Sequence, residues 1–139
     1  MAAISFVVLP GQLLSGTQQL ARLHFTAPIG QSSAFVPLVL SGVTGQRAQA
    51  GLTPTVLSNH GRGVVVNGQP LLDANLDSIG TRTLTLYGWP GTNYIIQTSS
   101  VPALPASWGN WRSITLSNIL QTTEANAATN GVIFYRARE

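Results

Sequence analysis

The stretch that most constrains the fold lies at residues 81–100, where apolar and small polar side chains alternate. Leu84 and Leu86 alternate with threonine, and the same spacing returns at residues 93–98. This period of two is typical of a half-buried β-strand. Gly-Trp-Pro-Gly at residues 88–91 separates the two runs, and proline and glycine supply the backbone angles that a chain reversal needs. The sequence therefore predicts one β-hairpin over residues 81–100.

Short apolar segments bounded by Gly and Pro recur along the whole chain, which favours an all-β protein. The segments expected to form strands are 4–9, 20–27, 34–43, 49–57, 64–67, 111–116 and 132–137. The polar stretch 117–131 is expected to hold one helical turn at 124–128. No segment sustains a period of 3.6, so the sequence predicts an antiparallel β-sandwich of the jelly-roll or Ig type.

The 139 residues are enough for one domain or two small ones. Residues 71–80 show no clear period, and we interpret them as a linker. The expected division is a β region at 1–70, the linker at 71–80 and a second small β-module at 81–139.

The charge pattern indicates which partners the protein lacks. The seven basic residues are all arginine, they are scattered, and the formal net charge is only +3. This is not the clustered basic surface of a nucleic-acid-binding protein, so no nucleic acid is expected.

Absence of cysteine excludes disulfides and thiolate zinc sites. The opening MAAISFVVLPG has no basic n-region and is too short for a signal peptide or a membrane span.

The second half carries a spaced motif. Its residues are Gly88, Gly91, Tyr94, Ile96, Gln97 and Ser99, then Trp111, then Glu124-Ala125-Asn126, then Phe134-Tyr135-Arg136-Ala137. This motif resembles a small β-module that recurs at the C-termini of large secreted proteins of Verrucomicrobia-like and Planctomycetes-like bacteria. The chain departs from that pattern before Trp111, where a Pro-containing loop with an additional Trp108 replaces the usual Asp-Leu.

The first half has a resemblance of its own. LARLHFTA, FVPLVLSGV and HGRGVVVN at residues 20–67 resemble the C-terminal half of a cohesin-like sandwich. The resemblance implies a truncated sheet whose unpaired edges need a partner edge, either from the second module or from another copy of the chain. The second possibility predicts homo-oligomerisation. Both resemblances imply a non-catalytic binding or scaffolding module that contacts protein or polysaccharide. They also imply a secreted or cell-surface parent protein whose N-terminus lies upstream.

The acidic residues Asp73 and Asp77 flank Asn75, so that oxygen ligands stand at alternate positions, as at the start of a calcium loop. Ser78 and Leu84 stand where an EF-hand needs Gly and Glu, so an EF-hand is excluded. Two interpretations stay open: a looser Ca²⁺ loop, and an Asx-rich linker whose turns are capped by its own side chains.

The tryptophans Trp89 and Trp108 are the candidate ligand-binding residues. Both are expected in loops, where an exposed aromatic face can stack on a sugar ring or contact a protein. The alternative is that each closes one end of the core. Trp111 and Tyr94 are expected inside the core.

A small hydrolase acting on an ester or lactone is the alternative function. His60 lies in Asn-His-Gly-Arg-Gly, and the second histidine is His24. In this interpretation a water polarised by a carboxylate, or by Ca²⁺ bound near Asp73 and Asp77, attacks the carbonyl of the substrate. One of the two histidines acts as the base. The chain has no G-x-S-x-G motif, and acids and histidines are scarce, so we favour the binding module.

Overall fold

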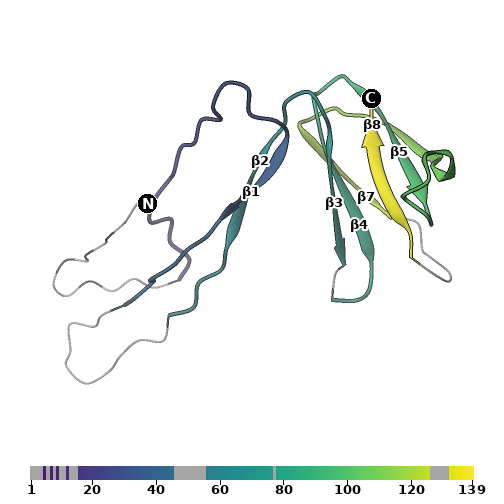
Figure 1. Cartoon of the computed structure of the whole chain (residues 1–139). Helices are drawn as coiled ribbons and strands as arrows, with labels where there is room; N and C mark the ends of the chain where they lie inside the picture. Colours follow the sequence, from purple (N-terminus) through teal and green to yellow (C-terminus); the bar gives the residue numbers. More distant parts are fainter. Residues whose placement is uncertain are drawn as a thin grey trace.

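The computed structural model describes residues 16–45, 56–76, 78–125 and 132–139, and the single positions 5, 7, 9 and 12. These residues form an all-β protein with three antiparallel sheets (Figure 1). The elements are β1 (Ala34–Leu38), β2 (Gly61–Val65), β3 (Leu71–Leu76), β4 (Arg82–Tyr87), β5 (Asn93–Ser99), the 3₁₀ helix η1 (Pro105–Ser107), β6 (Gly109–Thr115), β7 (Leu120–Glu124) and β8 (Phe134–Arg138).

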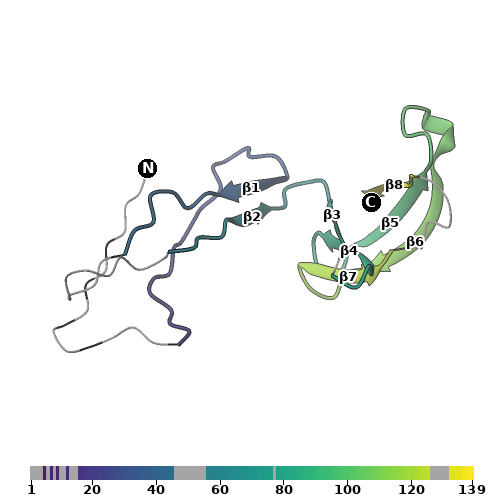
Figure 2. The ribbon, with the colours of Figure 1, turned by 90° about the horizontal axis from the view of Figure 1, so that it is seen from below.

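Two three-stranded sheets form a sandwich with the strand orders β3-β4-β7 and β6-β5-β8 (Figure 2). In the first sheet, Leu84 of β4 lies opposite Ala74 of β3 and Thr123 of β7. In the second, Ile96 of β5 lies opposite Ala137 of β8, and the register with β6 shifts directly after Ile96.

The core lies between these two sheets, and both contribute alternate side chains to it. The buried apolar residues are Leu84, Leu86, Tyr94, Ile96, Ile114 and Leu116. Leu72, Trp111, Ala125, Tyr135 and Ala137 are half-buried and pack against them. Burial of each large apolar side chain contributes about 1.5–3 kcal/mol. The faces predicted from the alternation at 81–100, and the core position of Tyr94, are confirmed.

The predicted hairpin at 81–100 is wrong, because β4 and β5 belong to different sheets. The apolar faces of the two strands lie opposite each other across the core. The connection therefore crosses from one sheet to the other. Its amides bond to the segment between β6 and β7: Gly88 donates to the Ile119 carbonyl at 3.1 Å and Gly91 to the Leu116 carbonyl at 2.7 Å.

The stretch expected as a linker begins with strand β3, whose residues 71–76 pair with β4 over their whole length. Leu72 lies opposite Leu86 and packs on the core, so this strand belongs to the sandwich. Similarly, Leu120–Glu124 forms β7 although a polar stretch with a helical turn was expected there. The remainder of that expected turn, and most of the expected strands 4–9 and 49–57, lie outside the described residues.

Strands β1 and β2 form a separate two-stranded sheet, the ribbon, which lies beside the sandwich (Figure 1). Ala34 is opposite Val65 at one end of the ribbon and Leu38 opposite Gly61 at the other. The alternating segment 20–27 forms no strand, which corrects the expectation. Its side chains, Phe25 among them, are exposed, and the segment pairs with none of the described strands.

Candidate functional site

The ribbon is attached to the outer face of the sandwich by a cluster of four side chains from four strands. Arg62 of β2 forms an ion pair with Asp73 of β3, in which Nη1 donates to Oδ1 at 3.1 Å. The guanidinium also lies 4.7 Å from the centre of the Phe35 ring, a cation–π distance. Phe35 of β1 meets Tyr87 of β4 edge to face, with ring centres 5.7 Å apart. The cluster therefore joins both ribbon strands to β3 and β4.

The electrostatics of the cluster follow from this ion pair. Hydrogen bonding by the Arg62 guanidinium lowers the pKa of the Asp73 carboxyl below its ordinary value, and partial burial opposes the effect. The same hydrogen bond raises the pKa of Arg62. Both groups are thus charged at neutral pH, and the junction is held by opposite charges.

The predicted calcium ligands Asp73 and Asn75 lie on a strand rather than in a loop. Their register partners on β4 are Thr85 and Thr83, which places both on the outer face of the sheet. The Asp73 carboxylate forms its ion pair with the Arg62 guanidinium. Asp77 lies outside the described residues, among which no group of three His, Cys, Asp or Glu side chains gathers. Calcium binding stays a prediction.

The two histidines lie in the first half of the chain and are both exposed. His60 precedes β2, and its Nδ1 accepts a hydrogen bond from the Leu40 amide at 3.2 Å. His24 lies in the strandless segment. Within the described chain, neither histidine contacts the one ion-paired carboxylate, that of Asp73. This hydrogen bond joins the residue before β2 to the segment that follows β1.

The tryptophans predicted as ligand contacts have different environments. Trp89, in the connection between β4 and β5, is 54% exposed. Trp108 is half-buried: its Nε1 donates to the Pro102 carbonyl at 3.2 Å, and the Arg136 guanidinium lies 4.3 Å above its ring. Arg136 is held in place by Gln97, whose Oε1 accepts from Nε at 2.8 Å. One face of Trp108 is therefore covered, whereas Trp89 is available for contact.

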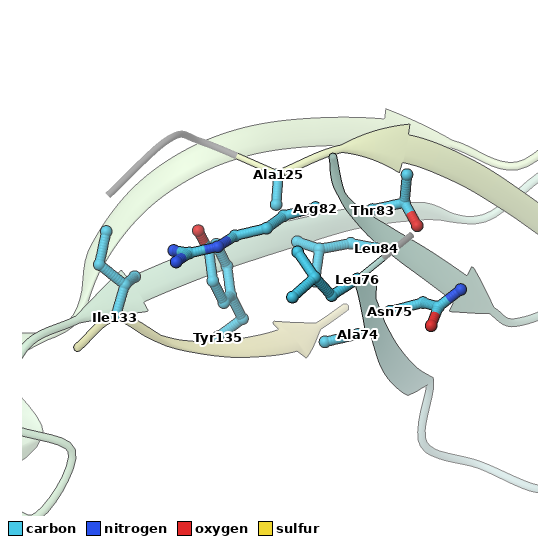
Figure 3. A pocket seen from close by; sticks show the side chains of 9 residues that line it. All are labelled: Ala74, Asn75, Leu76, Arg82, Thr83, Leu84, Ala125, Ile133 and Tyr135. Atoms are coloured by element: carbon cyan, nitrogen blue, oxygen red, sulfur yellow. The ribbon is translucent and has the colours of Figure 1, made fainter. Parts of the chain in front are cut away.

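A cavity of about 250 Å³ opens between the two sheets, where β3 and β4 approach β8 (Figure 3). Its lining is mostly apolar and includes Leu76, Leu84, Ala125 and Tyr135. The Arg82 side chain extends along it toward Ile133, as Figure 3 shows. The cavity thus combines an apolar interior with one cation.

Sequence reasoning missed both Arg82 and the Arg62–Asp73 pair. For Arg82 a signal exists: it stands two residues before Leu84 in an alternating strand, so an arginine occupies the inward-facing series. For Arg62 and Asp73 no such signal exists, because their contact depends on how the ribbon lies against β3.

No helix within the described residues is long and apolar enough to cross a membrane. Comparison of the chain with family models, with curated proteins and with solved structures found no match.

Proposed function

We propose that this chain is a non-catalytic binding module in which the sandwich holds the ribbon ready to pair with a strand of another protein. The observation that carries the proposal is the ribbon itself, a two-stranded sheet with both outer edges unpaired among the described strands. Such a ribbon is marginally stable alone in water and gains stability from a third strand. Unpaired edges are also the usual sites at which an extended segment is added to a sheet.

The side chains around the ribbon support this function. Val36 of β1 is 39% exposed, and Val39 and Leu40, which follow β1, are more exposed still. The single charged residue of the ribbon strands is Arg62, and its charge is turned to Asp73. The ribbon strands thus carry no unpaired charge that opposes pairing between sheets, and Pro37 of β1 is their one residue without an amide donor.

The first partner to test is a second copy of this chain, since each copy carries the same unpaired edges. The low share of charged residues, 8%, and the resemblance to modules of secreted proteins support a secreted or cell-surface setting for the parent protein. Polysaccharide contact through the exposed face of Trp89 is a second route of binding, which a glycan array with Trp89→Ala tests.

Sedimentation equilibrium over a wide concentration range tests the self-association. The wild-type chain is expected to associate, and Val36→Lys is expected to reduce association because it places a charge on the ribbon. Thr115→Lys is the matched control, a change at another exposed position, on β6 of the sandwich. A wild-type chain that stays monomeric at every concentration, or equal effects of both lysines, contradicts self-association through the ribbon.

A further inference from the structure

The cavity between the sheets reaches the packed interior. Leu84 lies on its floor and is only 1% exposed, as part of the buried core. Ala74 and Leu76 of β3 form one wall, and Ile133 and Tyr135 at β8 form the other. An apolar group in the cavity would therefore contact both sheets and remove apolar surface from water.

The strand register explains why the Arg82 side chain lies at the cavity. Arg82 lies opposite Leu76 at the start of β4 and belongs to the same inward-facing series as Leu84. Glu124 on the neighbouring strand lies opposite Thr83, in the outward-facing series. In the described part of the chain the one ion pair is that of Arg62 and Asp73, so the Arg82 guanidinium pairs with no carboxylate there. It can form two parallel hydrogen bonds to a planar carboxylate.

The volume of the cavity limits the size of its occupant. About 250 Å³ corresponds to roughly eight water-sized groups, at about 30 Å³ each. A chain of about eight carbon atoms fills this space, and its polar end lies at the arginine. Shorter aliphatic acids therefore leave part of the apolar lining uncovered, and in longer ones the additional carbon atoms extend beyond the cavity.

From these three observations we propose that the cavity binds a medium-chain monocarboxylate, with the alkyl chain between the sheets and the carboxylate on Arg82. This site is separate from the ribbon and does not depend on the proposed association.

Methyl NMR of the full chain, titrated with sodium octanoate, tests the site directly. Saturable shifts are expected at the methyl groups of Leu84, Ala125 and Ile133. In the series from butanoate to octanoate, each added methylene is expected to raise the affinity about fourfold, and the gain should end once the cavity is filled. Octylamine, with the same chain and the opposite charge, is expected to leave these methyls unshifted.

Two substitutions separate the arginine from general charge effects. Arg82→Gln is expected to weaken octanoate binding at least about tenfold. Arg138→Gln makes the same change on β8, opposite Ile95 in register, and is expected to leave the affinity unchanged. Ala74→Phe is expected to block binding by filling the cavity.

The proposal is overturned if millimolar octanoate gives no saturable shift at these methyls. It is overturned equally if octylamine binds as well as octanoate, or if both arginine variants lose the same affinity. Should Arg82→Gln fail to fold, the comparison of octanoate with octylamine on the wild-type chain still decides whether a positive charge selects the ligand.

Discussion

The Tyr94 ring lies directly against Gly88, so that a Cβ atom on Gly88 would come within 2.5 Å of the ring. The Tyr94 hydroxyl in turn accepts a hydrogen bond from the Trp89 amide at 2.9 Å. These two contacts join the end of β4 to the start of β5 across the core. They explain how the chain leaves one sheet and enters the other within a few residues.

Gly88→Ala is expected to destabilise the sandwich by about 1–3 kcal/mol, because the new methyl group would have to displace a ring that is itself fully buried. Chemical denaturation followed by tryptophan fluorescence measures the loss. Gly109→Ala on β6 is the matched control, since nothing lies within 4 Å of its Cβ position, and it should change stability by no more than about 0.5 kcal/mol. Equal stability of the two variants would contradict the close contact.

Tyr94→Phe keeps the ring and removes only the acceptor of the Trp89 amide. The expected cost is about 1 kcal/mol, because a part-buried amide then loses its partner. Amide hydrogen exchange at Trp89 should become faster, whereas exchange in the centre of β5 should follow only the change in global stability. An unchanged exchange rate at Trp89 would show that the hydrogen bond does not form.

Much of the sandwich could be predicted from the alternation of side chains. The spacing of Leu84, Leu86 and Ile96 identifies their inward faces, and all three lie in the core. The same spacing does not show which strands are neighbours in a sheet. Two consecutive strands bury the same alternate positions whether they pair within one sheet or face each other from two sheets. The hairpin expected at 81–100 failed for this reason.

The candidate sites were less accessible to sequence reasoning. Asp73 was interpreted as a calcium ligand from its spacing to Asn75, but its contact is with Arg62, eleven residues earlier and on another sheet. The expected loop position identified Trp108 as a candidate for exposure, yet Arg136 covers one face of the ring. Contacts of this kind depend on the relative position of strands, and local patterns carry no information on it.

Substitution of the two tryptophans is expected to change stability by different amounts. Trp108→Ala is expected to cost about 1–2 kcal/mol, since it removes the indole from Arg136 and its hydrogen bond to Pro102. Trp89→Ala removes a mostly exposed side chain and should change stability by less than about 0.5 kcal/mol. Urea unfolding of both variants measures the difference. A larger loss for Trp89 would show that it, and not Trp108, closes the end of the core.

The attachment of the ribbon should depend on pH through Asp73. Its carboxyl has a pKa lowered by the Arg62 guanidinium, so the ion pair stabilises the junction at every pH above the ordinary value, about 3.9. As the pH falls through the lowered pKa, Asp73 becomes protonated and this stabilisation is lost. Amide exchange in β1 and β2, measured at several pH values, should therefore show the ribbon opening more often below about pH 4.

Asp73→Asn is expected to show the more frequent opening already at neutral pH and little further change in acid, because it lacks the titrating group. Glu124→Gln is the control, because it removes a carboxylate that forms no ion pair within the described chain. In this variant, opening of the ribbon should depend on pH as it does in the wild type. High salt should weaken the wild-type junction and leave Asp73→Asn nearly unaffected, since the pair is partly exposed. If Asp73→Asn and the wild type behave alike at neutral pH, the ion pair of Arg62 with Asp73 does not hold the ribbon.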